Sequence, residues 1–363
     1  MKEEHAAGPA SAYPLPVPLG KRRMAILAEG CFSPLGAKTA VCLVRYAAHE
    51  IAAVIDSTLA PSTVERALGF GGPVPIVSSL SEALARRPDV LVLGTAPRGG
   101  RMAPSDRAAV LDAIEAGLHV AGGMHELLAD DAEIAAAARR RGVVLWDARR
   151  PPDGLGVSSG AGASCPVVMT VGSDCNTGKM TAAMEIHLGL LRAGVRSGFA
   201  ASGQTGIMIA GTGIAIDRVI ADFIGGATER LVAETSRGRD VVVLEGQGSI
   251  LHPGYAGVTQ GMIAAARPRA CVLCHQPTRE TVRGYGVSIP PLAALARLYE
   301  NAAAGIAKIP VVGVALNTFD LGEGPARAAV ERASRETGLP AADPVRFGAA
   351  PLVEAVLETM RRP

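Results

Sequence analysis

The residues with the clearest potential for chemistry lie in one short loop, Gly172-Ser-Asp-Cys-Asn-Thr-Gly-Lys179. An apolar run precedes this loop and an amphipathic segment follows it, so the pattern predicts a strand, a turn and a helix that opens at Gly178-Lys179. Backbone amides, a helix N-terminus and a lysine in this arrangement favour an anion. We therefore expect a phosphate-bearing cofactor at this phosphate loop. The residues expected to contact it are Gly172, Asp174, Asn176, Thr177, Gly178, Lys179, Met180 and Thr181.

The phosphate loop departs from the common Walker A form. Five residues separate Gly172 from Gly178, one more than in that form. Met180 also replaces the serine or threonine that normally helps to hold Mg²⁺, and Thr181 follows one place later. The sequence thus predicts anion binding, from which ATP hydrolysis does not follow, and we expect no resident metal. An ordinary strand–turn–helix with a capping lysine is the structural alternative.

A second group of polar residues follows the apolar run that ends at Glu245. This carboxylate has the position of a Walker B residue, where it could hold Mg²⁺ or act as a base. Gln247, Ser249 and His252 come next on a glycine-rich loop. We take Glu245 and His252 as candidate catalytic bases; a buried structural glutamate and a loop histidine with its hydrogen bonds satisfied are the alternatives.

Gln204 and Thr205 lie just beyond a third expected strand, in a polar and glycine-rich segment. Because α/β sheets bind ligands in the crevice at the carboxyl ends of their strands, this segment predicts close approach to a ligand. A hairpin-like connection is the alternative. Asn317 ends a late expected strand, where an Asx turn is the alternative to ligand contact.

Two further patterns contain cysteine. Cys271-Val-Leu-Cys-His275 matches a haem attachment pattern. It lies inside an apolar run, where the two cysteines of a strand would point to opposite faces, so we expect neither haem nor zinc. Cys175 lies in the phosphate loop, near a helix N-terminus and Lys179, which would favour a thiolate. A nucleophilic or redox role for Cys175 is one hypothesis, and packing is the other.

These residues need elements that hold them, and the chain contains two series of apolar runs alternating with helical segments. Such alternation predicts parallel α/β sheets. The first series, 23–150, predicts a Rossmann-like domain, and the second, 166–363, a P-loop NTPase-like α/β domain. Residues 151–165 are rich in proline, glycine and serine, as linkers are. Residues 1–22 have the composition of a disordered leader.

The first domain lacks the dinucleotide fingerprint G-x-G-x-x-G, because its first turn holds only Gly30 and Gly36. The second expected strand nevertheless ends at Asp56, where nucleotide-binding folds often hold an acidic residue. We expect a Rossmann-like shape and little support for NAD. The residues that could line a cleft, or instead cap and pack, are Asp56, Arg98, Arg101 and His125.

Charge and hydropathy argue against several classes of partner. The chain has 36 Lys and Arg against 34 Asp and Glu with no block of like charges, so no nucleic-acid partner is expected. No apolar run reaches about 18 residues, and no signal peptide is evident, so we expect no membrane association or export. The six cysteines are then expected as reduced thiols in the cytoplasm. We expect a homo-oligomer that acts on a small molecule.

Several blocks of the sequence resemble known families. The phosphate loop, with Asp174 two places after its first glycine, is similar to that of dethiobiotin synthetase-type enzymes, in which an asparagine at the place of Asn317 contacts an adenine. Longer blocks, among them VGSDCNTGKMTAAMEIHL, VVLEGQGSILHPGYAGVT and GGMHELLADD, resemble the D-glutamate N-acetyltransferase family, long described only as a domain of unknown function. The resemblance covers nearly the whole chain after the leader. It implies a Rossmann-like domain followed by a P-loop domain.

The resemblance also implies an activity, the transfer of an acetyl group from acetyl-CoA to the amine of an acidic amino acid, D-glutamate in particular. The phosphate loop and Asn317 would hold CoA without ATP turnover. Glu245 and His252 are then candidate bases, and Gln204 is a candidate donor to the oxyanion. The residues expected to contact the acceptor are Thr205, Gln247, Ser249, Arg279 and Arg346, the two arginines as partners of a dicarboxylate.

Two other functions stay open on the residues alone. One is an ATP-dependent ligase or kinase of a small carboxylate with Mg-ATP as its cofactor, which Asp174, Lys179, Thr181 and Glu245 also suit. The other is a non-catalytic nucleotide-sensing module. Met180 in the magnesium position favours the transferase and the sensor over the ligase.

Overall fold

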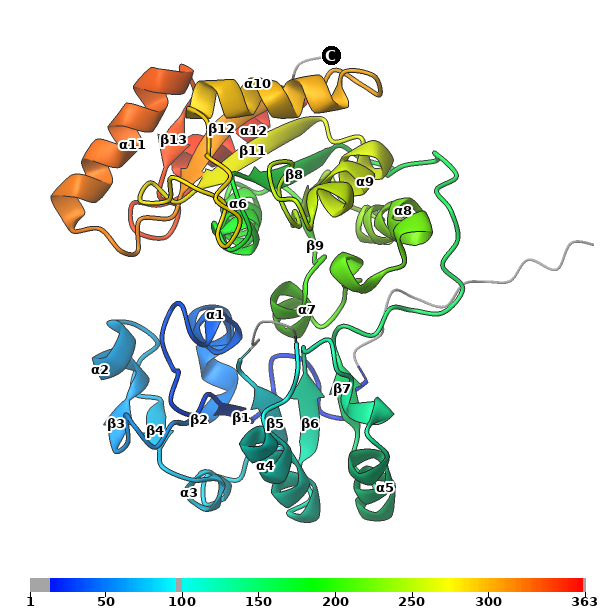
Figure 1. Cartoon of the computed structure of the whole chain (residues 1–363), viewed down its shortest axis with the longest axis vertical. Coiled ribbons are helices and arrows are strands. Elements are labelled where there is room, and N and C mark those ends of the chain that lie inside the picture. The colour runs from blue at the N-terminus through cyan, green and yellow to red at the C-terminus, as the bar shows by residue number, and fades with distance from the viewer. Residues whose placement is uncertain (1–13, 96–99, 362–363) are drawn as a thin grey trace, which may run out of the picture. The chain divides into compact units, whose positions relative to one another are not determined.

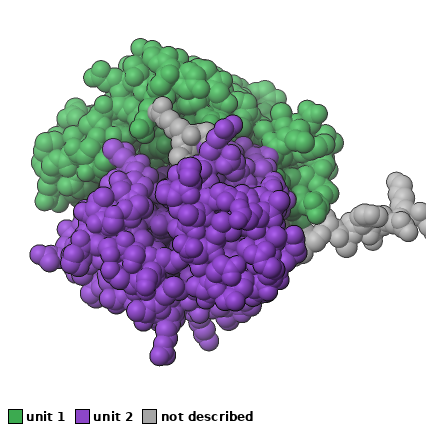
Figure 2. Space-filling view, turned by 60° about the horizontal axis from the view of Figure 1, so that its bottom comes forward, with its two compact units in different colours: residues 1–10, 151–203, 219–363 green, residues 11–150, 204–218 purple. Residues whose placement is uncertain are grey.

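The structure is a computed structural model that describes residues 14–95 and 100–361. The described chain forms two compact units (Figure 2). Unit 2 contains the residues up to Arg150 together with a later segment, 204–218. Unit 1 contains residues 151–203 and 219–361. Each unit is organised around its own β-sheet.

Unit 2 is built on a seven-stranded sheet in the order β3-β4-β2-β1-β5-β6-β7 (Figure 1). All neighbouring strands are parallel except the β3–β4 pair. Continuous apolar runs form the central strands, which are buried on both faces. The strands are β1 (Met24–Leu27), β2 (Ile51–Ile55), β3 (Ser62–Thr63), β4 (Pro75–Val77), β5 (Val90–Leu93), β6 (His119–Gly122) and β7 (Leu145–Asp147). The helices between them are α1 (Lys38–Ala47), η1 (Ala48–Glu50), α2 (Val64–Leu68), α3 (Leu80–Leu84), α4 (Pro104–Glu115), η2 (Leu128–Asp130) and α5 (Ala132–Arg141).

A segment from much later in the chain completes unit 2. It contains α7 (Gln204–Ala210) and the short helix η3 (Ile216–Arg218). The helix α7 packs against α1, where the hydroxyl oxygens of Thr39 and Thr205 lie 3.0 Å apart. The structure thus differs from the uninterrupted domain expected from residue 166 onward, because the apolar side chains of Ile207 and Met208 are buried in unit 2.

The expected leader includes residues that are buried in unit 2. Residues 1–13 lie outside the described residues, but Leu15 and Arg22 are buried. Arg22 pairs with the buried carboxylate of Glu50 through two guanidinium nitrogens. Because an unpaired charge is costly to bury, this ion pair fixes the chain before β1 to η1.

Unit 1 is built on a six-stranded, fully parallel sheet in the order β13-β12-β11-β8-β10-β9 (Figure 1). The strands are β8 (Val167–Gly172), β9 (Ser197–Ala200), β10 (Val241–Leu244), β11 (Ala270–His275), β12 (Val311–Leu316) and β13 (Ala341–Ala342). The helices are α6 (Lys179–Arg192), η4 (Ala221–Phe223), α8 (Ile224–Thr235), α9 (Ala256–Ala266), α10 (Leu292–Ala303), α11 (Glu323–Thr337) and α12 (Ala350–Arg361). Within residues 14–95 and 100–361, none of the helices combines the length and apolar character that a bilayer crossing requires.

The segment expected as a linker, 151–165, is bound to unit 1 by one carboxylate. Glu229 of α8 accepts hydrogen bonds from the hydroxyls of Ser158 and Ser159 and from backbone amides of residues 159–161. Burial by itself would raise the pKa of Glu229, but the hydrogen bonds outweigh it and lower this pKa to about 2. The segment is therefore an ordered part of unit 1.

Replacing Glu229 by Gln should reduce stability at neutral pH and have a smaller effect in acid. The folded-state pKa of Glu229 lies below its ordinary value of 4.5, so the carboxylate contributes stability that is complete above that pH and is lost as the pH falls toward 2. Urea unfolding of the wild type and of Glu229→Gln at pH 7 and pH 3 measures the difference in unfolding free energy. That difference should be smaller at pH 3. An equal difference at both pH values would show that Glu229 acts through packing alone.

Candidate active site

The phosphate loop joins β8 to α6 in the middle of the unit 1 sheet. The strand β8 lies between β10 and β11 and is buried along its whole length. Asn176 and Gly178 have positive φ angles of 57° and 97°, which let the chain turn back before α6 begins. The turn closes around the carbonyl oxygen of Asp174, which accepts from the Thr177 hydroxyl at 3.1 Å and from Lys179 Nζ at 2.8 Å. The strand, loop and helix expected here are therefore present.

The first glycine of the loop is closely surrounded. A Cβ atom at Gly172 would lie 3.0 Å from Lys179 Nζ. Tyr299 of α10 donates its hydroxyl proton to the Gly172 carbonyl at 2.7 Å and accepts from the Ile250 amide at 3.3 Å. Burial raises the pKa of Tyr299 to about 12, so the hydroxyl keeps its proton. No motif singled out Tyr299, yet it ties the phosphate loop to the loop that carries His252.

A small cavity of about 50 Å³ lies beside the phosphate loop on the side of Asn317. A Cβ atom at Gly178 would lie 3.5 Å from that of Asn317, so the two expected cofactor contacts are neighbours. The volume of this cavity is well below the roughly 300–1,000 Å³ of typical ligand pockets, so it would hold only part of a nucleobase such as adenine. Its lining residues are Thr177, Gly178, Thr181, Ala182, Ala315, Leu316, Asn317, Asp343, Pro344 and Val345.

Met180 points into the core rather than toward this cavity. Its side chain is 2% exposed, whereas Thr181 lines the cavity. The position after the lysine therefore offers neither a hydroxyl nor another group that could bind a phosphate-bound metal.

Arg279 clamps the phosphate loop from the chain that follows β11. Its Nη1 atom donates to Asp174 Oδ2 at 2.9 Å and to the Cys175 carbonyl at 2.6 Å. Asp174 is completely buried, and it also accepts from the backbone amides of Cys175 and Arg283. Arg279 was expected to bind the acceptor, but its guanidinium already serves the Asp174 carboxylate.

Glu245 directly follows β10 and is 4% exposed. Its Oε2 atom accepts from the amides of Ser202 and Gly203 at 3.1 and 3.2 Å, and its Oε1 atom accepts from Gln247 Nε2 at 3.1 Å. Three donors thus occupy the carboxylate and leave few lone pairs for a substrate proton. Glu245 therefore holds in position the chain that leaves β9. Its position at the end of a Walker B strand does not by itself predict this role.

His252 and Ser249 lie on the loop after Glu245, and both are buried. His252 Nδ1 accepts from the Gly254 amide at 3.1 Å, and its ring lies 4.7 Å from the rings of Tyr255 and Tyr285. Ser249 accepts from the Leu251 amide at 3.2 Å and supports the turn. The imidazole is therefore fixed in place by its backbone contact and by two aromatic rings.

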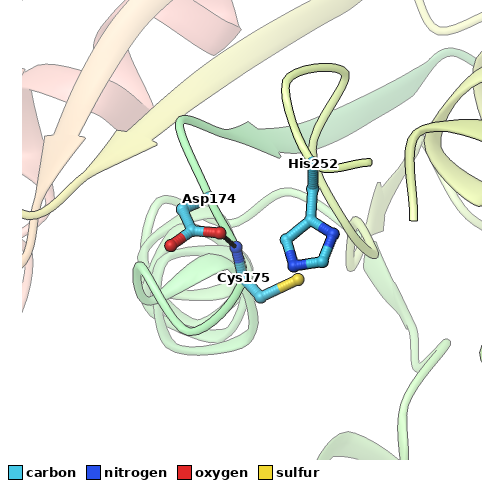
Figure 3. Close-up of side chains that lie close together, drawn as sticks. All are labelled: Asp174, Cys175 and His252. Atoms are coloured by element: carbon cyan, nitrogen blue, oxygen red, sulfur yellow. Dashed lines mark hydrogen bonds between the residues drawn. The ribbon is translucent and has the colours of Figure 1, made fainter. Parts of the chain in front are cut away.

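Figure 3 shows the His252 ring beside the side chain of Cys175, with Asp174 on the other side of the loop. One donor atom from each of the three residues lies within 4.8 Å of the others. Aspartate, thiolate and imidazole are possible metal ligands. Both carboxylate oxygens of Asp174 are, however, already occupied by amides and Arg279. The arrangement therefore supports thiol and imidazole chemistry better than metal binding.

Cys271 and Cys274 belong to the interior of unit 1. Both lie in β11 and are buried, and burial raises the pKa of each thiol to about 12. Such thiols are protonated and unreactive at neutral pH.

Three more expected site residues have protein partners of their own. Gln204 and Thr205 belong to unit 2, where Gln204 Oε1 accepts from Arg149 Nε at 3.3 Å. Arg346 is exposed, and its Nη1 atom donates to the carbonyls of Thr318 and Leu321. The acidic residue expected after the second strand, Asp56, is completely buried and accepts hydrogen bonds from the loops around it, so it is a structural anchor. Arg98 lies outside the described residues.

Two models of one protein family match the chain. A Rossmann-like domain of unknown function, DUF1611_N, matches residues 57–151, and the P-loop domain of the same family matches residues 153–353. The chain belongs to the DUF1611 family. The prediction of a Rossmann-like domain followed by a P-loop domain is therefore confirmed.

Relatives of known name cover most of this DUF1611 chain. A protein from Tritonibacter scottomollicae, named D-glutamate N-acetyltransferase, is 37% identical over 77% of this chain and 84% of its own length. A protein of the same name from Pseudoalteromonas sp. is 33% identical over 74% of this chain and 82% of its own length. The crystal structure of a DUF1611 family protein from Anabaena variabilis is 39% identical, covers 93% of this chain and 99% of its own, and superposes with a TM-score of 0.88. The family resemblance inferred from the sequence blocks is confirmed.

Proposed function

We propose that this protein is an amino-acid N-acetyltransferase that uses acetyl-CoA and accepts an acidic amino acid, D-glutamate first. The observation that carries the proposal is 37% identity to a protein of that name over 84% of its length. The phosphate loop supports it, because it offers an anion site whose metal-binding hydroxyl is replaced by the buried Met180.

Coenzyme A carries a pyrophosphate and an adenine, and both have a counterpart in unit 1. The pyrophosphate would lie against the loop amides, the N-terminus of α6 and Lys179. The adenine would lie at the small cavity beside Asn317 and Thr181. The remaining loop contacts expected from the sequence, Asn176 included, belong to the same proposal.

The reaction needs a base. The acceptor ammonium first loses one proton to water, and the free amine nitrogen then attacks the thioester carbonyl carbon. The CoA sulfur leaves as the thiolate, and the base passes the second nitrogen proton to it, which gives free CoA thiol. Of the two candidate bases, His252 is favoured, because its acceptor nitrogen Nδ1 would have to release only one hydrogen bond, that from the Gly254 amide, whereas the carboxylate of Glu245 accepts three. Gln247 and Ser249, on the same loop, would then position the reacting groups. Gln204 stays the candidate donor to the oxyanion, because Arg149 binds its amide oxygen and not its Nε2 donor.

Cys175 suggests a different route, in which its thiol would carry the acetyl group between CoA and the amine. Both routes make the same demand on the pantetheine arm of CoA, because the Cys175 thiol and the nearer nitrogen of the His252 ring lie within 4.8 Å of each other. We propose direct transfer to the amine, which needs no covalent step on the enzyme.

Two properties of the whole protein complete the proposal. All six cysteines are free of disulfides, which suits the reducing cytoplasm. We also expect a homo-oligomer, which light scattering of the purified protein would measure.

Acetyl-CoA and D-glutamate should release free CoA thiol in the presence of EDTA and without ATP. The rate should rise with pH, because the acceptor reacts as the free amine. A thiol-release assay over D- and L-glutamate, D- and L-aspartate and neutral amino acids measures this. Release that requires ATP and Mg²⁺ would favour a carboxylate ligase instead. CoA or ATP binding without turnover of any amino acid would favour a nucleotide sensor.

A further inference from the structure

A cluster of charged residues lies at the carboxyl ends of β6 and β7 in unit 2. His125 follows β6, Arg149 follows β7, and Asp217 and Arg218 come from η3 in the inserted segment 204–218. We call these four residues the Arg149 cluster. The carboxyl edge of a parallel sheet is where α/β domains bind small ligands, and the cluster takes no part in the phosphate loop of unit 1.

Arg149 is the centre of the cluster. Its Nε atom donates to the Gly123 carbonyl at 2.6 Å, its Nη1 atom lies 3.2 Å from His125 Nε2, and the same Nη1 atom pairs with Asp217 Oδ2. The side chains of Arg149 and Asp217 are 13% and 18% exposed. The Arg149–Asp217 pair is thus sheltered from water but not sealed from the surface.

Two polar atoms of the cluster have no protein partner among the described residues. They are Asp217 Oδ1, an acceptor, and Arg218 Nε, a donor, and both are buried. Arg218 is held nearby by a hydrogen bond from Nη2 to the His125 carbonyl at 3.1 Å. Because buried polar groups are nearly always satisfied, the unpaired acceptor and the unpaired donor on consecutive residues indicate that water or a small polar ligand lies against them.

An α-amino acid supplies both complements on one carbon atom. Its ammonium can donate to Asp217 Oδ1, and its carboxylate can accept from Arg218 Nε. With two arginines against one aspartate, the cluster carries an excess of positive charge, which favours an amino acid with an additional carboxylate. A metal ion would be repelled by both guanidinium groups.

We propose that the Arg149 cluster binds an acidic amino acid through its ammonium and its α-carboxylate. The inference rests on the proposed transferase function only for the class of ligand, an acidic amino acid, and not for its binding.

The test compares D-glutamate with glutarate, which has the same two carboxylates and no amine. Isothermal titration of the wild type should show tighter binding of D-glutamate. Asp217→Asn should weaken D-glutamate binding by about 10-fold or more, because it removes a charged hydrogen bond. It should change the affinity for glutarate by no more than about twofold. Arg218→Gln should weaken both ligands by similar factors. The matched control is Asp130→Asn, which removes a surface aspartate of unit 2 that pairs with Arg150 and is 62% exposed; it should change neither affinity.

If Asp217 has a purely structural role, Asp217→Asn would lower the melting temperature and leave the ratio of the D-glutamate and glutarate affinities unchanged. That result would overturn the proposal. Failure of the wild type to bind D-glutamate, with or without CoA, would overturn it too. Thiol release separates this result from the proposed function. Transfer to D-glutamate, together with equal D-glutamate affinity of the wild type and Asp217→Asn, would reject the cluster and keep the transferase. Selective binding of D-glutamate without thiol release would reject the transferase and keep the cluster.

Discussion

Replacing His252 by Asn should lower kcat for acetyl transfer by about 10²–10⁴-fold, the usual contribution of a general base. The imidazole is buried beside two tyrosine rings, and its Nδ1 atom would release the Gly254 amide in order to take the proton of the acceptor. Steady-state thiol release at saturating acetyl-CoA measures kcat. The affinity for CoA, measured by calorimetry, should stay within about twofold, because His252 is not expected to contact the phosphates.

Two comparison variants separate the possible roles of the residues around His252. Cys175→Ala should keep most of the activity if transfer to the amine is direct. A loss as large as that of His252→Asn, together with an acetylated wild-type cysteine in the mass spectrum, would show transfer through the thiol. If Glu245→Gln loses 10²-fold or more while His252→Asn stays active, then Glu245 is the base.

Replacing Lys179 by Ala should weaken CoA binding by about 10²-fold, because a charge-assisted contact to a sheltered phosphate is worth roughly 2–3 kcal/mol. Lys179 is 7% exposed and lies with its Nζ atom on the phosphate loop, 2.8 Å from the Asp174 carbonyl. Isothermal titration with CoA, and with Mg-ATP for comparison, measures the effect. The melting temperature reports separately on any loss of the buried contact.

Lys308→Ala is the matched control, because Lys308 is an exposed lysine of the same unit. It should leave CoA binding unchanged. Equal CoA affinity in the wild type and in Lys179→Ala would show that the loop does not bind the CoA phosphates. A selective loss of Mg-ATP binding would instead assign the loop to ATP.

Features carried by consecutive residues could be predicted from the sequence. The strand, turn and helix around Lys179 follow from an apolar run, a glycine-containing turn and an amphipathic segment, each a property of neighbouring residues. The proximity of Asn317 to Gly178 could also be predicted from the sequence, because the strands of a parallel sheet end at one edge and bring their loops together. The burial of Met180 fits the same pattern, since it occupies an inward-facing place on the first turn of α6.

The choice of partner for each polar side chain was decided only by the tertiary structure. Arg279 lies 105 residues from Asp174, and no local pattern indicates that its guanidinium is taken up by that carboxylate. Tyr299 has no motif, and it bonds to Gly172 because α10 carries it to the loop. Gln204 follows a strand of unit 1 in sequence but packs in unit 2, where burial of α7 decides its place. Local sequence sets which groups are present and what backbone they adopt, whereas the cost of burying a charge or an unpaired donor selects partners across the whole fold.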